Sequence, residues 1–305
     1  MRCLSPIYCA ATSLLILLQP EVIAEPTVIR LWPDLAPGET TSEEGVLLPR
    51  RANEDPPATR ISKITAPSLE AYLAPQNHNR GTAIIACPGG GLNYVVSDKE
   101  GSEAAAWLNS MGVSLYVLKY RTKNGSSFEG LRPLQDVQRA IRWLRANATQ
   151  QGLNKERIGV MGFSAGGLVG ALAASSGKAP AYPSADGIDK ESCRPDFALL
   201  LYPGLLLDSK KETLIPQLKI DEMTAPTFIA TAHNDPITPL NSLELYRALN
   251  RAGVSAELHV YVDGGHGYGM RQVEGSYVHT WRDRATDWLA KHELILSVQG
   301  PTPGR

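Results

Sequence analysis

A serine held between two glycines is the residue of this sequence best suited to act as a nucleophile. Residues 162–166 read GFSAG and fit the pattern G-x-S-x-G around Ser164. The run 157–161 predicts a short buried strand before the motif, and 168–174 predicts a helix after it. A serine on so tight a strand-to-helix turn exposes its hydroxyl at the carboxyl end of a sheet, and glycines relieve the crowding there. The pattern predicts a nucleophile, with a simple turn of small residues as the alternative.

A serine hydroxyl needs a base to take its proton and a carboxylate to orient that base. Of the six histidines, His266 alone lies in a glycine-rich loop, GGHGYG at 264–269, between a predicted strand and a predicted helix. We therefore expect His266 to be the base. Asp235 follows a predicted strand, at the edge where ligand-facing residues gather, and we expect it to orient the ring. A turn or helix-cap role for Asp235 is the alternative, and Asp263 is the rival acid.

Donors for a developing oxyanion are expected after the predicted strand 82–87. Three consecutive glycines, 89–91, leave backbone N–H groups unobstructed by side chains. The amide of Ala165, at a helix N-terminus, would complete such a hole. A flexible turn is the alternative, and a phosphate loop is disfavoured because no G-x-x-x-x-G-K-[ST] pattern follows.

The elements that must position these residues alternate between strand and helix patterns from residue 81 onward. Strands are predicted at 82–87, 113–118, 157–161, 197–202, 226–232 and 258–262, and helices around 104–111, 133–144, 168–174, 245–252 and 278–289. This alternation predicts an α/β fold with a mostly parallel central sheet and helices on both faces. Two insertions, 177–194 and 204–222, predict short lids over the strand ends.

The chain before the core is predicted to have two parts. Residues 1–24 carry an apolar run too short to span a bilayer, followed by small residues, which predicts a signal peptide and a secreted or periplasmic protein without a membrane anchor. An uncleaved anchor is the alternative. Residues 25–60 predict an N-terminal arm, 61–296 a catalytic domain and 297–305 a C-terminal tail. Within this domain, 61–73 alternates loosely around a proline and predicts early edge strands.

Composition narrows the classes of partner. The net charge is −1 and no Lys/Arg cluster stands out, which argues against a nucleic-acid-binding surface. No clustered His/Cys/Asp set has ligand spacing, so neither a metal nor a cofactor is expected. Signal cleavage would leave Cys87 and Cys193, and whether they form a disulfide stays open because a sequence does not give the distance between them.

Together these motifs resemble secreted bacterial esterases of the α/β-hydrolase superfamily, nearest to acetylxylan-esterase-like and feruloyl-esterase-like carbohydrate esterases, which are relatives of hormone-sensitive-lipase-type enzymes. The resemblance is carried by PGGG at 88–91, GFSAGG at 162–167, the DP turn at 235–236 and GHG at 265–267, and further by LWPDLAPG at 31–38 and LKYR at 118–121. The chain order serine, aspartate, histidine is also the one expected for that superfamily. Pro88 stands where lipase-type members have histidine, so the substrates of that branch are not carried over.

The resemblance implies an α/β-hydrolase fold and oxyanion donors at Gly90, Gly91 and Ala165. It also implies an exported serine esterase that cleaves acetyl or feruloyl esters, with a small-molecule or plant-polysaccharide ester as its substrate. A peptidase-like or lactone hydrolase, or a non-catalytic binding protein on the same scaffold, is the alternative. Tyr94 and Tyr268 are candidates for stacking on a sugar or feruloyl ring, with aromatic packing as the alternative.

Overall fold

Eight strands form one central sheet in the computed structural model, which describes residues 26–122, 132–177, 179–208 and 213–296. In spatial order they are β1 (Thr27–Arg30), β4 (Ser68–Tyr72), β7 (Val113–Lys119), β5 (Thr82–Cys87), β8 (Ile158–Phe163), β9 (Ala198–Leu201), β12 (Thr227–Ala232) and β13 (Ala256–Tyr261). The first two pairings, β1 with β4 and β4 with β7, are antiparallel, and every later pairing is parallel. The predicted mostly parallel sheet is confirmed.

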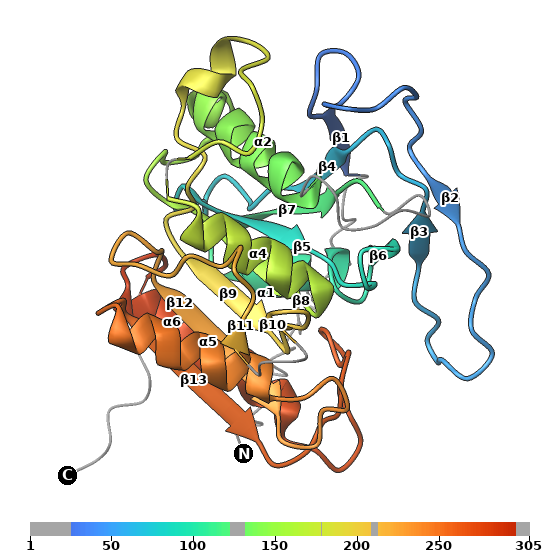
Figure 1. Cartoon of the computed structure of the whole chain (residues 1–305), viewed down its shortest axis with the longest axis vertical. Helices are drawn as coiled ribbons and strands as arrows, with labels where there is room; N and C mark the ends of the chain where they lie inside the picture. Colours follow the sequence, from blue (N-terminus) through green and yellow to red (C-terminus); the bar gives the residue numbers. More distant parts are fainter. Residues whose placement is uncertain (1–25, 123–131, 178, 209–212, 297–305) are drawn as a thin grey trace, which may run out of the picture.

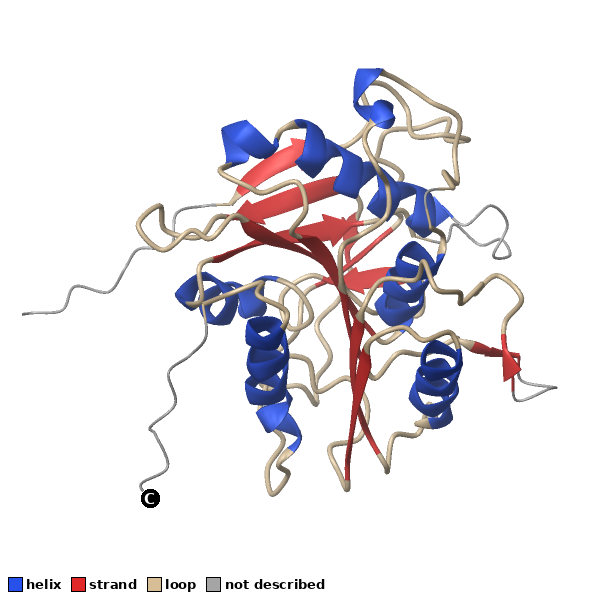
Figure 2. Ribbon diagram, turned by 90° about the vertical axis from the view of Figure 1, so that its left-hand side faces the viewer, coloured by secondary structure: helices blue, strands red, loops and turns tan. Residues whose placement is uncertain are grey.

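Helices cover both faces of this sheet, as Figure 2 shows. The helices are α1 (Ala105–Ser110), α2 (Arg132–Ala146), α3 (Ala148–Gln151), α4 (Ala165–Ser175), α5 (Leu240–Arg251) and α6 (Trp281–Lys291), with 3-10 turns η1 (Ser102–Ala104), η2 (Gly187–Lys190) and η3 (Val278–Thr280). Buried apolar side chains of α2, α4 and α5 form a core on one face, and those of α1 and α6 form a core on the other. The two tryptophans of α6, Trp281 and Trp288, belong to this second core and are 0% and 2% exposed.

The strands differ in burial as their positions in the sheet require. All six residues of β5 are buried, because this strand is interior and covered on both faces. The last strand, β13, is at the edge, and its residues are exposed or half-buried. The sequences of the two predicted strands agree with these environments, since 82–87 is a continuous apolar run and 258–262 alternates between apolar and polar residues.

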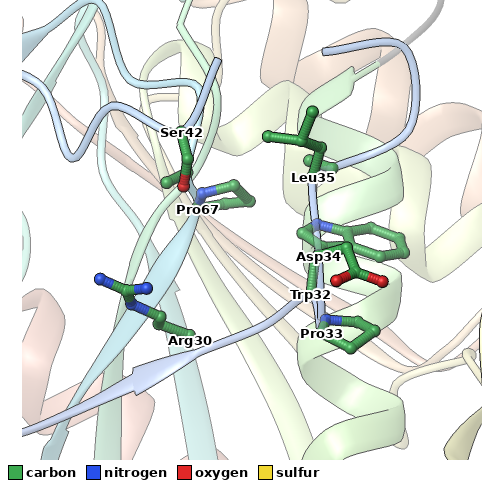
Figure 3. A pocket seen from close by; sticks show the side chains of 9 residues that line it. Arg30, Trp32, Pro33, Asp34, Leu35, Ser42 and Pro67 are labelled. Atoms are coloured by element: carbon green, nitrogen blue, oxygen red, sulfur yellow. The ribbon is translucent and has the colours of Figure 1, made fainter. Parts of the chain in front are cut away.

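The start of the predicted arm takes part in the central sheet. Strand β1 pairs along β4, which makes β4 an interior strand, so the prediction that 61–73 would supply only edge strands was wrong. Pro67 does separate two strands: a second sheet is built from β2 (Val46–Leu47), β3 (Arg60–Ser62) and β6 (Tyr94–Val96). A hollow of about 330 Å³ lies beside Trp32, lined also by Arg30 and Asp34, and none of the predicted catalytic residues lines it (Figure 3).

The two insertions differ in where they lie. Part of the first, 179–194, packs against α2 through Arg139. The second holds the short strands β10 (Leu207–Asp208) and β11 (Thr213–Leu214) and begins beside the nucleophile, where the Gly204 N–H donates to the Ser164 carbonyl oxygen at 2.9 Å (Figure 1).

The predicted signal peptide, 1–24, and the predicted tail, 297–305, both lie outside the described residues. Within the ranges that the structure describes, no helix is both long and apolar enough to cross a membrane. Cys87 and Cys193 are buried free thiols, so they are not joined to each other.

Candidate active site

Ser164 lies on the turn between β8 and α4, with φ +53° and ψ −120°. A residue with a side chain avoids this region, so the backbone here is strained, as expected for a serine on a tight strand-to-helix turn. The helix begins at Ala165, three residues before the predicted start, so the serine directly precedes the first helical turn.

Two glycines let this turn close. A Cβ on Gly166 would lie 1.9 Å from the carbonyl oxygen of Cys87, and a Cβ on Gly162 would lie 2.4 Å from the carbonyl oxygen of Gly166. Both neighbours are backbone atoms, which cannot swing aside as a flexible side chain would. The glycines of the G-x-S-x-G pattern are therefore required by close approach between β5, β8 and α4.

The structure brings together the three residues predicted to form a triad. The Nε2 atom of His266 lies 2.7 Å from Ser164 Oγ. Its Nδ1 atom lies 3.0 Å and 2.9 Å from the two carboxylate oxygens of Asp235. These distances suit a proton on Nδ1 that is donated to Asp235 and a lone pair on Nε2 that faces the serine hydroxyl.

Asp235 is held for this contact on the loop that follows β12. Its side chain is 3% exposed, and Oδ1 also accepts the N–H of Ile237 at 2.8 Å. The main-chain carbonyl oxygen of Asp263, the rival acid, accepts a hydrogen bond from the Ser276 hydroxyl. Because both Asp235 oxygens contact Nδ1 of His266, the structure favours Asp235 over this rival.

Asn234 is a neighbour of the triad that the sequence reasoning missed. Its Oδ1 accepts the N–H of Gly265 at 2.9 Å, which ties the loop after β12 to the loop that carries His266. The signal in the sequence was its position directly before Asp235, in a turn that ends a predicted strand.

The glycine run after β5 passes close to Ser164. The Gly89 N–H donates to Glu100 Oε2 at 2.8 Å. Among the described residues, none accepts a hydrogen bond from the N–H of Gly90 or Gly91. Ala165 is the first residue of α4, so its N–H has no acceptor within the helix. These three amides are those that the resemblance assigned to the oxyanion.

Two buried tyrosines contact the glycine run and His266. Tyr120, within the LKYR segment, donates its hydroxyl to the Pro88 carbonyl oxygen at 2.6 Å and so fixes the start of the glycine run. Burial holds the pKa of Tyr120 well above its usual range, so this hydroxyl keeps its proton. Tyr202 follows β9, and its ring lies edge-on to the His266 ring with centroids 5.0 Å apart.

The two aromatic candidates for substrate stacking have different environments. Tyr268 is 2% exposed and packs against Tyr202 with ring centroids 4.4 Å apart, so the alternative given for it, aromatic packing, is the one observed. The ring of Tyr268 lies in the core behind the loop that carries His266. Tyr94 is half-buried on β6, and its hydroxyl accepts a hydrogen bond from Arg51 at 2.9 Å.

The described residues hold no group of three or more histidine, cysteine, aspartate or glutamate side chains placed to bind a metal ion. The chemistry that the site can perform follows from its own side chains and amides: activation of a hydroxyl, transfer of its proton and stabilisation of an oxyanion.

Known proteins resemble this chain in sequence. The family model BD-FAE matches residues 69–192, a range that includes the glycine run and Ser164. An acetylxylan esterase of Xylanibacter ruminicola is 29% identical over 220 residues, which are 64% of this chain and 42% of that protein. The endo-1,4-beta-xylanase B of Butyrivibrio fibrisolvens is 28% identical over 226 residues, 66% of this chain and 34% of that protein. The chain thus spans less than half the length of these curated relatives.

A solved structure resembles the chain over nearly its whole length. The acetyl ester-xyloside bifunctional hydrolase from Caldicellulosiruptor lactoaceticus is 27% identical, with a TM-score of 0.73, and the match covers 90% of this chain and 99% of that one. The deep-sea metagenome α/β hydrolase MGS-M1 is 26% identical with a TM-score of 0.61. The fold and the resemblance expected from the motifs are both confirmed.

Proposed function

We propose that this chain, an α/β-hydrolase that resembles acetylxylan esterases, is a serine esterase that cleaves acyl esters. The observation that carries the proposal is the continuous contact from Ser164 Oγ through His266 to Asp235, at 2.7 Å and 2.9 Å. A hydroxyl with a base at hydrogen-bond distance and a buried carboxylate behind that base is the arrangement that makes an alcohol nucleophilic.

The reaction proceeds in two halves. Ser164 Oγ attacks the acyl carbon while His266 Nε2 takes its proton, and the amides of Gly90, Gly91 and Ala165 stabilise the oxyanion. The imidazolium then gives that proton to the leaving alcohol, and an acyl-enzyme remains. Water, deprotonated by His266, attacks the acyl-enzyme, and the proton returns to Ser164 as the acid leaves.

Acetyl or feruloyl esters on plant polysaccharide are the proposed substrates. Support comes from the names of the similar proteins, an acetylxylan esterase, a xylanase and an acetyl ester-xyloside hydrolase. Export to the periplasm or beyond is part of the proposal and rests on the apolar start of the sequence. It predicts that the mature protein, sequenced from its N-terminus, begins near Glu25.

The Ser164→Ala variant tests the proposal. We expect kcat on p-nitrophenyl acetate and on acetylated xylan to fall about 10⁴-fold or more, because the nucleophile is lost. Ser110→Ala, at the exposed end of α1, is the matched control and should keep wild-type activity.

Two outcomes would contradict the role of Ser164 as the nucleophile, and a third would contradict the choice of bond. One is near wild-type ester hydrolysis by Ser164→Ala. The other is a folded wild-type protein that a fluorophosphonate probe does not label, which would favour a non-catalytic binding protein. A substrate panel that includes amides and lactones decides the bond: a kcat/KM higher for either class than for esters would overturn the ester assignment.

A further inference from the structure

A buried carboxyl group that the proposed chemistry does not use, that of Glu100, lies behind the glycine run. Glu100 is 4% exposed, and its Oε2 accepts the Gly89 N–H at 2.8 Å. A Cβ on Gly89 would lie 2.7 Å from this Oε2 and 2.8 Å from the Cβ of Ser164. Gly89 therefore lies between the Glu100 carboxyl group and Ser164, close to both.

The other carboxyl oxygen is connected to the histidine loop. Glu100 Oε1 accepts the Tyr202 hydroxyl at 2.8 Å, and the same hydroxyl accepts the Gly269 N–H at 2.9 Å. A Cβ on Gly267, next to His266, would lie 4.0 Å from Oε1. Through its two oxygens, Glu100 contacts the glycine run directly and the loop of the base through Tyr202.

These contacts favour the ionised form of Glu100. The Tyr202 hydroxyl accepts from an amide, so its own hydrogen is available to donate to Oε1, while Oε2 already accepts the Gly89 N–H. A carboxyl group that receives two donors is best satisfied as a carboxylate. The other titratable groups facing it are Lys99, Tyr120 and His266.

Burial and hydrogen bonding oppose each other at this group. Burial raises the pKa of Glu100 above its ordinary value, while the hydrogen bonds from Tyr202 and Gly89 and the charges of Lys99 and His266 lower it. A carboxylate at this position attracts the positive charge that His266 carries once it has taken the proton of Ser164.

We propose that Glu100 is a positioning residue that orients the glycine run and the histidine loop and compensates the positive charge that His266 gains in the transition state. This inference rests on the proposed esterase function. By engaging the Gly89 N–H, Glu100 leaves the next two amides for the oxyanion. Its negative charge opposes the oxyanion itself, but the imidazolium forms at the same moment, and those amides face the oxyanion directly.

Glu100→Gln tests this role because it keeps the size of the side chain and removes its charge. We expect kcat for p-nitrophenyl acetate to fall about 10- to 100-fold with KM within about threefold of wild type, because the interaction strengthens in the transition state. Affinity for a boronic acid, which forms a tetrahedral adduct with the serine, should fall in parallel with kcat. Glu70→Gln is the matched control, since Glu70 pairs with Lys119 on a neighbouring strand of the sheet.

The pH dependence of kcat/KM distinguishes loss of the Glu100 charge from a purely structural effect of the substitution. Removal of this negative charge from behind the site should move the acidic limb of kcat/KM to lower pH in Glu100→Gln. Tyr202→Phe keeps the carboxyl group of Glu100 and removes the hydroxyl that contacts both Glu100 and Gly269, so it should lower kcat and leave the acidic limb in place. Glu100→Asp should also keep the limb in place, and these two variants test the proposal if Glu100→Gln does not fold.

A Glu100→Gln enzyme with the kcat of Glu70→Gln would overturn the proposal, as would a lower kcat with an unmoved acidic limb. These failures are distinguishable from failure of the esterase assignment. If Ser164→Ala is inactive while Glu100→Gln is fully active, only the role of Glu100 is rejected. If Ser164→Ala is fully active, the esterase assignment is rejected whatever Glu100→Gln does.

Discussion

Asn234 shows how one side chain outside the proposed triad sets its geometry. Its amide oxygen accepts the Gly265 N–H, directly before His266, while the next residue in the chain, Asp235, contacts the ring. Two adjacent residues of the loop after β12 thus hold the backbone and the side chain of the base at once. A base must stay within hydrogen-bond reach of the hydroxyl that it deprotonates, so small displacements of this loop reduce the rate.

Replacement of Asn234 with alanine should lower kcat about fivefold, the rate equivalent of one neutral hydrogen bond of about 1 kcal/mol. KM should change little, because the loop orients the base rather than the substrate. Steady-state kinetics on p-nitrophenyl acetate measure this effect, with Asn250→Ala at the exposed end of α5 as the control. Equal kcat in the two variants would show that the Gly265 contact does not position the base.

The sequence was sufficient to predict that Ser164, Asp235 and His266 lie together, because each is in a local pattern that also fixes its place at a strand end. Glu100 and Tyr202 carried no such pattern: they are 102 residues apart, and their contact exists only in the folded chain. Tyr268 shows what sequence position alone leaves open. Its place near His266 allowed either substrate stacking or aromatic packing, and only the folded chain shows that this ring faces the core.

Helix α2 joins the sheet to the N-terminal segment through Arg139, whose side chain is 2% exposed. Its Nε donates to the Leu31 carbonyl oxygen at 2.8 Å, and its other nitrogens contact Asp186 and Asp189 at 2.5 Å and 3.0 Å. The guanidinium carbon lies 5.1 Å from the Trp32 ring centre, which adds a cation–π contact. One residue of this helix therefore binds both the arm and the turn η2.

Arg139→Met should lower the free energy of unfolding by about 3–5 kcal/mol, because it leaves the Asp189 carboxylate, 0% exposed, without this buried partner. Arg142, which also reaches Asp189 at 3.3 Å, reduces the loss toward the lower end of that range. Urea unfolding measures the change. Arg247→Met, on an exposed part of α5, is the control and should stay within about 0.5 kcal/mol of wild type. A loss no larger than that of the control would show that the cluster does not stabilise the fold.

Most elements of the central sheet were predictable because their partners impose a periodic pattern on the sequence. Strand β5 was predicted with its observed bounds, since an interior parallel strand must be apolar throughout. Strand β1 was missed: it has four residues, is largely exposed, and forms only because β4 offers it an edge. Its conformation is a property of the pairing and leaves little signal in its own residues.

The topology of the whole molecule explains how three distant residues meet. Strands β8, β12 and β13 run parallel with β9 between the first two, so the loops after them emerge at one edge of the sheet. Ser164, Asp235 and His266 follow these strands in turn, so the first and the last, 102 positions apart in the chain, meet at that edge. The order of the strands therefore determines the site, while the loops determine its chemistry.

Two carboxyl groups should give the stability of the molecule opposite dependences on pH. Burial raises the pKa of Glu100 above 4.5, so the folded chain holds this proton to a higher pH than the unfolded chain does. Its contribution to stability is therefore largest below pH 4.5 and falls as pH rises through the folded pKa. The Arg139 hydrogen bond lowers the pKa of Asp186 below 3.8, so the contribution of Asp186 is present above pH 3.8 and is lost as pH falls.

Urea unfolding of wild type, Glu100→Gln and Asp186→Asn between about pH 3 and pH 8 tests both signs. The difference in unfolding free energy between wild type and Glu100→Gln should fall as pH rises above 4.5, because wild type alone must lose the buried proton. The difference between wild type and Asp186→Asn should shrink as pH drops below 3.8, because the carboxylate paired with Arg139 becomes protonated. A flat or inverted difference for either variant would mean that its carboxyl group titrates alike in the folded and unfolded chains.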